Sequence, residues 1–198
     1  MHTSGIRTAF LTLVTVACAG LLQAQGAGPP VTAADIRFMQ EMTVHHRQAV
    51  EMTALLRLRT RSPQMRSLAE RITVSQTDEL AMMRRWLEKH GAAPAGDGGR
   101  DMAAQGGHAM AADGTMRSMP GMLTPAELRT LSTARGARFD RLFLAGMIKH
   151  HEGALSMVSA LQATPGAAQE SSVNSFVIEV DTDQRAEIAR MRRLLSGR

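Results

Sequence analysis

The chain has 198 residues, a formal net charge of +5, 44% hydrophobic residues and 3% aromatic residues. This length fits one domain with a sizeable core, and the abundance of Ala, Leu, Met, Arg and Glu favours an all-helical protein. Few aromatic side chains are present for base stacking, and the Arg residues are scattered, which argues against a nucleic-acid-binding protein. The positive charge is therefore interpreted as a solvated surface.

The N-terminus predicts a secretory signal peptide over residues 1–24. Arg7 supplies the positive start, an apolar run follows over residues 9–22, and small residues mark the cleavage site. Cys18, the only cysteine, lies inside this segment, and lipid attachment there is the alternative. The mature chain, residues 25–198, is then free of cysteine and has no apolar run long enough to span a membrane. We expect a periplasmic or secreted protein.

Helix start and stop signals divide the mature domain into two hairpins and a connection. Thr32 and Ser62 are predicted caps of the two helices in a first hairpin, residues 33–90. A Met- and Gly-rich linker follows over residues 91–123, and residues 124–196 contain a short helix plus a second hairpin. The four long helices are predicted over residues 33–58, 63–89, 137–162 and 169–195.

An internal repeat relates the two hairpins. The segment 38–52 recurs at 143–157, a shift of 105 residues, with Phe, Met, a His pair, Ala and Met at matching positions. The second helix of each hairpin repeats a Gln-x-x-Glu pattern, at Gln76 and at Gln184. Two tandem αα-hairpins predict an all-α fold, a ferritin-like four-helix bundle with a long Met-rich crossover.

The repeated His pairs and Gln residues all lie near the middle of their helices. A residue at mid-helix stays at the midplane of a bundle in any helix direction, so these groups can converge. One interpretation is a hydrogen-bonded structural layer, with the methionines as core filling. The other is a metal site, and thioether with imidazole suits Cu(I) best. The candidate ligands on the helices are Met42, His45, His46, Met52, Met147, His150, His151 and Met157.

The linker contains further methionines that have no obvious core to fill. They form a Met-x-x-Met-x-x-Met array in a Gly- and Ala-rich stretch. One interpretation is a mobile arm that captures or delivers copper, and the other is a tether whose methionines dock on the bundle. The additional candidate ligands are His108, Met116, Met119 and Met122.

The paired motifs resemble an exported ferritin-like family labelled domain of unknown function 305. The resemblance covers residues 33–196 and is carried by the Met-x-x-His-His segments and by Gln76-x-x-Glu79-x-x-x-Met83 and its twin, Gln184-x-x-Glu187-x-x-x-Met191. It implies a four-helix bundle, and some members of the family are periplasmic copper-binding proteins linked to copper tolerance. One departure is Arg47, where the second copy has Glu152, so the two halves differ chemically.

Three hypotheses for function follow. The first is a non-enzymatic periplasmic protein that binds Cu(I) for buffering, tolerance or delivery, with the metal ion and a second periplasmic copper protein as partners. The second is a ferritin-like metal-dependent oxidoreductase in which Glu79, Glu187 and Glu152 join the histidines around two metals. The third is a purely structural or interaction module. The sequence leaves the oligomeric state open.

Overall fold

A computed structural model describes residues 28–94, 108–110 and 116–197. The predicted signal peptide lies outside these described residues. In chain order the elements are α1 (Ala33–Ala54), α2 (Leu56–Arg59), α3 (Pro63–Lys89), β1 (His108–Met110), β2 (Met116–Ser118), α5 (Pro125–Thr133), α6 (Gly136–Gln162) and α7 (Ser171–Leu195).

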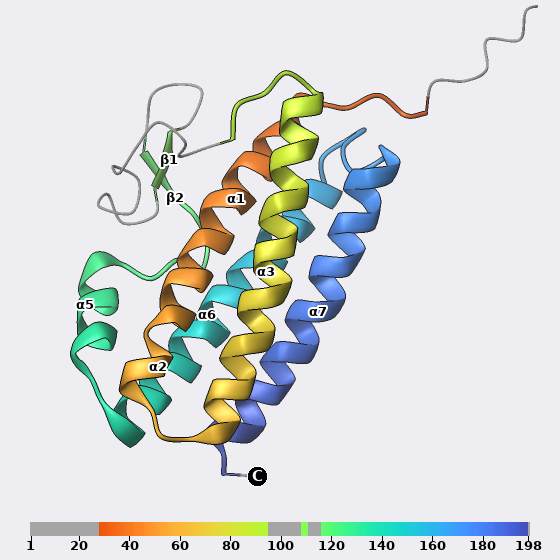
Figure 1. The fold of residues 1–198 in the computed structure, drawn as a ribbon. Helices are drawn as coiled ribbons and strands as arrows, with labels where there is room; N and C mark the ends of the chain where they lie inside the picture. Colours follow the sequence, from red (N-terminus) through yellow and green to blue (C-terminus); the bar gives the residue numbers. More distant parts are fainter. Residues whose placement is uncertain (1–27, 95–107, 111–115, 198) are drawn as a thin grey trace, which may run out of the picture.

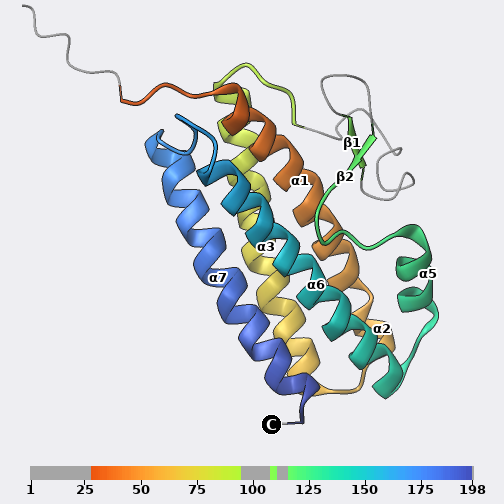
Figure 2. The same ribbon diagram turned by 180° about the vertical axis from the view of Figure 1, so that it is seen from behind.

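The four long helices form a bundle of two tandem hairpins, α1 with α3 and α6 with α7, which confirms the predicted fold (Figures 1 and 2). Each helix runs antiparallel to both of its neighbours, so α6 begins at the end opposite to the one where α3 finishes (Figure 1). At 1.5 Å per residue, a helix such as α3 is about 40 Å long. The crossover is long because it must travel this distance.

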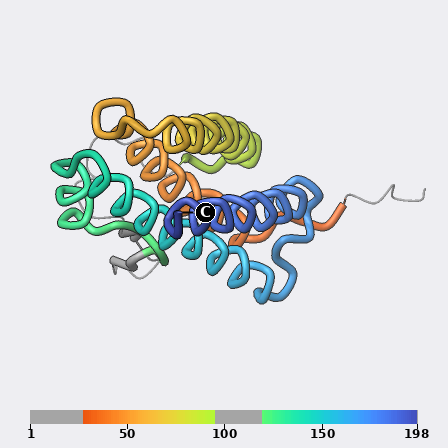
Figure 3. The backbone as a smooth tube through the Cα atoms, turned by 90° about the horizontal axis from the view of Figure 1, so that it is seen from below, coloured from red at the N-terminus to blue at the C-terminus, as the bar shows by residue number. Residues whose placement is uncertain are grey.

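Two details differ from the prediction. The helix expected over residues 33–58 ends at Ala54, and a separate turn, α2, follows Leu55. The crossover also contains a short antiparallel ladder, β1 with β2, in which His108 pairs with Ser118. This ladder and α5 lie outside the four long helices, on the side of α1 and α6 (Figures 2 and 3).

The helix caps explain why the chain divides where it does. Thr32 and Thr124 each form a capping box, and the Ser62 hydroxyl accepts from the backbone of Met65. Asp35, the partner of Thr32, is fully buried, and its second carboxylate oxygen accepts from the Ala168 N–H at 2.7 Å. This bond ties the start of α1 to the turn between α6 and α7.

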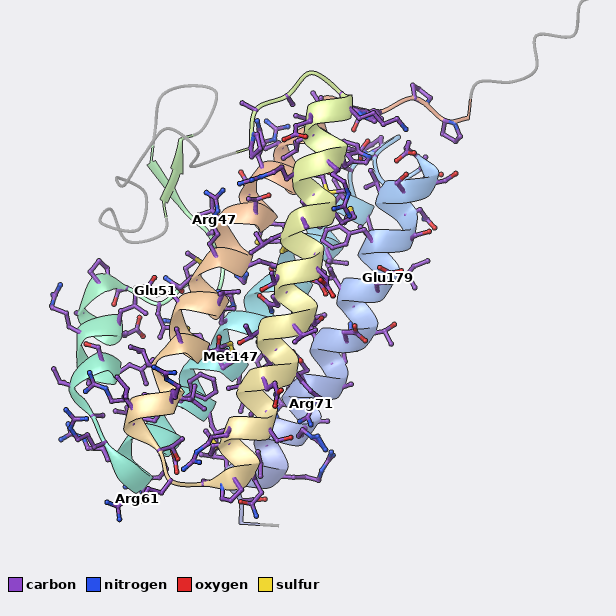
Figure 4. The ribbon with its side chains drawn as sticks, viewed as in Figure 1. Arg47, Glu51, Arg61, Arg71, Met147 and Glu179 are labelled. Carbon is purple, nitrogen blue, oxygen red and sulfur yellow. The ribbon has the colours of Figure 1, made fainter. Side chains whose placement is uncertain are left out.

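The core consists of two hydrophobic clusters with a polar layer between them. An upper cluster includes Phe38 and Phe176, and a lower cluster includes Leu68 and Phe139. Along each of the four helices, the histidines or the buried Gln lie between the residues of one cluster and those of the other. Figure 4 shows Met147 in the interior of the bundle and Glu179 on the outer face of α7.

The last residues of the crossover dock on the bundle as a strap, residues 119–123, along the seam of α1 and α6. The Gln48 amide donates to the Leu123 carbonyl at 3.0 Å and accepts from the Leu123 N–H at 2.7 Å. On the other side, a Cβ atom on Gly153 would lie 2.1 Å from the Pro120 carbonyl oxygen, so α6 and the strap touch backbone to backbone.

This docking corrects the expectation that the linker methionines have no core to fill. Met119 and Met122 are buried against Val44 of α1, so the docked interpretation holds for these two residues. The side chains of His108 and Met116 lie outside the described residues. Within the part of the chain that the structure describes, no helix combines the length and apolar character needed to cross a membrane.

Candidate metal centre

The four histidines of the repeat meet at the middle of the bundle, and all are fully buried. The first histidine of each pair lies against its twin: the ring centroids of His45 and His150 are 3.8 Å apart, and the ring planes are tilted by 39°. The second histidine of each pair faces a carboxylate from the neighbouring helix. His46 Nε2 bonds to Glu79, and His151 Nε2 bonds to Glu187 at 2.5 Å. The repeat in the sequence is therefore a two-fold arrangement in space.

These hydrogen bonds define the tautomers of three rings. A carboxylate or carbonyl oxygen only accepts, so the ring nitrogen that faces it carries the proton. This applies to His46, to His151 and to His45, whose Nε2 donates to the Pro120 carbonyl at 3.0 Å. In the neutral form of each ring, the lone pair is then on Nδ1. Histidines that bind metals in proteins are oriented in this way by a carboxylate or a backbone carbonyl.

The polar layer leaves many buried atoms without a hydrogen-bond partner in the described part of the chain. A buried polar atom left unpaired costs about 1–3 kcal/mol, so a purely structural layer would pair them. Neither ring nitrogen of His150 makes a hydrogen bond of normal geometry. The unpaired atoms are His45 Nδ1, His46 Nδ1, His150 Nδ1 and Nε2, His151 Nδ1, Gln76 Nε2 and Oε1, and Gln184 Oε1.

Thioethers lie on both sides of this layer. Met42 and Met157 belong to the upper cluster, and Met52 and Met147 belong to the lower one. Each cluster contains two further methionines that the sequence-based ligand set lacks, Met39 and Met83 above and Met65 and Met191 below, and of these Met83 and Met191 are matching residues of the repeat. The signal for this matching pair was present, because each ends a repeated Gln-x-x-Glu-x-x-x-Met motif. The donors therefore fit a soft metal ion, with imidazole nitrogen in the middle and thioether sulfur on either side.

The sequence over residues 35–195 matches the family described as domain of unknown function DUF305. The chain belongs to the DUF305 family. A candidate secreted DUF305 protein from Streptomyces coelicolor is similar in structure, with a TM-score of 0.68 and 29% identity over 83% of this chain and 93% of its own. A DUF305 fragment from Deinococcus radiodurans gives a TM-score of 0.67 and 30% identity over 86% and 100%.

A third similar structure is that of CopM in a Cu(I)-bound form. Its TM-score is 0.60 and its identity 25%, over 82% of this chain and 96% of CopM. CopM structures with Cu(II) and with Ag are similar as well. A search of curated proteins finds no match for this DUF305 chain.

Not every predicted carboxylate reaches the centre of this DUF305 protein. Glu152, one of three carboxylates expected around a metal pair, is exposed and accepts from Arg192 at 2.6 Å on the surface. Glu79 and Glu187 each pair with a histidine, His46 and His151, and do not face each other as two carboxylates that bridge a metal pair would. Among the described residues, no three His, Asp or Glu side chains gather in a way that could hold a metal ion.

Burial keeps the inner histidines of this DUF305 protein neutral. Desolvation, followed by the charge of His46, lowers the pKa of His45 from 6.5 to about 3. Desolvation and the neighbouring His45 and His151 hold the pKa of His150 well below 6.5. Burial raises the pKa of Glu79, but the hydrogen bond and charge of His46 outweigh it, and the net pKa is lowered. Neutral imidazole is the form that binds metals.

We expect the metal-free protein to lose stability as pH falls below about 6.5. An unfolded His takes up a proton near pH 6.5, whereas folded His45 stays neutral down to about pH 3. At pH 5 this difference costs about 2 kcal/mol for His45, and His150 acts in the same direction. The lowered pKa of Glu79 adds a further loss below about pH 4.5. Urea unfolding between pH 8 and pH 5 measures this loss of stability. In a His45→Gln variant, the free energy of unfolding should change less with pH. A wild-type free energy of unfolding that did not change with pH would contradict the prediction.

Proposed function

We propose that this protein is an extracytoplasmic copper-binding protein that holds Cu(I) with thioether and imidazole groups in the core of its bundle. The main support is the set of unpaired imidazole nitrogens between two groups of buried methionines. Sulfur and nitrogen donors without charge suit Cu(I), and thioether is a poor ligand for Mg²⁺, Ca²⁺ or Mn²⁺.

The residues divide into ligands and orienting groups in this proposal. His46 and His151 would bind through Nδ1 while Glu79 and Glu187 fix each ring through Nε2. His150 would supply a further nitrogen donor, since both of its ring nitrogens are buried without a partner. Met42, Met52, Met147 and Met157 supply sulfur above and below them, with Met83 and Met191 as additional donors. Methionine needs no deprotonation to bind and is not lost to disulfide formation, which suits an oxidising compartment.

The relatives support the same assignment. The DUF305 protein of Streptomyces coelicolor is a candidate secreted protein, and CopM has structures with Cu(I), Cu(II) and Ag. With the predicted signal peptide, these likenesses favour copper buffering or tolerance outside the cytoplasm. In this role the protein would also deliver copper to a partner, a second periplasmic copper protein. We propose no catalytic step, because binding alone accounts for the donor set.

The test is an anaerobic Cu(I) titration against a competing chelator with the double variant Met42→Leu and Met147→Leu. Leu keeps the apolar volume at a small packing cost and cannot coordinate. We expect Cu(I) affinity to fall at least about tenfold while the fold is retained. The matched control is Met39→Leu, because Met39 is equally buried in α1 but is not among the proposed ligands. Wild-type affinity in the double variant would exclude the core as the metal site.

A further inference from the structure

The two-fold arrangement of thioethers is broken at one residue. Met42, Met52, Met83, Met147 and Met191 have a relative exposure of 0%, whereas Met157 is 7% exposed. Met52 and Met157 occupy matching positions of the repeat, so equivalent side chains differ in their access to solvent. A metal ion could therefore reach the core more readily at one end than at the other.

The reason for this difference lies in what covers each end of the α1–α6 seam. At the upper end, a groove of about 400 Å³ runs between the two helices, and Met157, Phe38 and the strap residues Met119 and Pro120 line it. At the lower end, buried Leu123 covers the seam next to Gly146, whose Cβ position is 3.5 Å from the Met52 methyl group. Met52 lines no part of the groove beside α5.

We propose that this upper groove is the entrance through which Cu(I) reaches the core, and that Met119 and Met157 are its first ligands. The inference depends on the proposed function and adds the route by which Cu(I) enters the core. From Met157 the ion moves to Met42 and Met83, which share its cluster. Each step exchanges one neutral thioether for another, so copper stays in the Cu(I) state and no proton is released.

Thioether chemistry, not charge, would select the ion at this entrance. Arg37 and Glu41 also line the groove, so its walls carry one charge of each sign and do not favour cations in general. The contact between the strap and α6 fixes the position of Met119, because the Pro120 carbonyl packs directly against Gly153, one helical turn before Met157. The entrance is thus formed jointly by the crossover and the repeat.

The experiment measures the rate of Cu(I) transfer from a coloured chelator by stopped flow. Met119→Leu should slow both uptake and release of Cu(I) at least about tenfold. The equilibrium Kd should stay nearly unchanged, because Met119 binds the ion only during its passage and not in the final site. The control is Met122→Leu, which alters a second buried methionine of the strap that does not line the groove. It should exchange copper at the wild-type rate.

A second pair of variants leaves every thioether in place. Ala160 is exposed and lines the upper groove, so Ala160→Phe should fill the groove and slow uptake to a similar degree. Ala145 is exposed beside the closed lower end, and Ala145→Phe should exchange copper at the wild-type rate. Wild-type rates of Cu(I) transfer in Met119→Leu or in Ala160→Phe would overturn the proposal that the upper groove is the entrance. Failure of the wild type to bind Cu(I) would instead overturn the proposed function.

Discussion

Replacing His150 with Leu should lower Cu(I) affinity at least about a hundredfold while leaving the metal-free protein as stable as the wild type, or about 1 kcal/mol more stable. Both ring nitrogens of His150 are buried without a normal hydrogen bond, so an apolar side chain removes two unpaired polar atoms from the core. The same change removes a proposed soft-metal donor from the polar layer. Urea unfolding and chelator competition measure the two effects separately.

Gln48→Leu is the matched comparison and should show the opposite pattern. Gln48 is buried and makes both of its hydrogen bonds to the backbone of Leu123, which the variant would leave unpaired. We expect a loss of about 2–4 kcal/mol of stability with Cu(I) affinity unchanged at equilibrium. If His150→Leu instead lost several kcal/mol and kept its affinity, the histidines would be a structural layer.

Gly153→Ala should destabilise the protein by about 2–4 kcal/mol, which is large for the addition of one methyl group. The new Cβ would lie 2.1 Å from the Pro120 carbonyl oxygen and 2.6 Å from the Gly121 Cα. Both obstacles are backbone atoms, so no side-chain rotation relieves the overlap and the strap must move away from α6. Denaturant unfolding measures the loss, and faster oxidation of Met119 reports the displaced strap.

Gly146→Ala provides the control within the same helix. Its nearest neighbour would be a terminal methyl group of Leu123 at 3.1 Å, which can shift by a small rotation. Ala also favours a helix interior by about 1 kcal/mol relative to Gly. We expect the two effects nearly to cancel, with stability within about 1 kcal/mol of the wild type. Equal destabilisation in both variants would show that the strap contact is not the cause.

The periodic parts of the fold could be predicted from the sequence. Caps such as Thr32 and Thr124 mark where helices begin, and the repeat of 105 residues predicts two similar hairpins. The meeting of His45 with His150 follows from their mid-helix positions, since such residues stay at the midplane of any bundle. Local signals and simple geometry determine these features.

The remaining features depend on contacts that no periodic pattern reports. The bond between His46 and Glu79 requires the rotation of two helices about their axes, and the sequence shows only that both residues lie on apolar faces. The docking of Met119 and Met122 joins an irregular segment to distant helices. The place of Glu152 on the surface likewise depends on a partner from another helix, Arg192.

The strap also bears on how a duplicated protein can lose its symmetry. Gln48 and Gly153 occupy matching positions of the repeat, 105 residues apart. One holds the strap by a side-chain amide, and the other accommodates it by having no side chain. A dimer of two identical, separate hairpins would carry the same residue at both positions and could not offer both surfaces at once. Joining the hairpins in one chain allows the two copies to specialise. The first copy hydrogen-bonds the strap, and the second leaves room for its backbone.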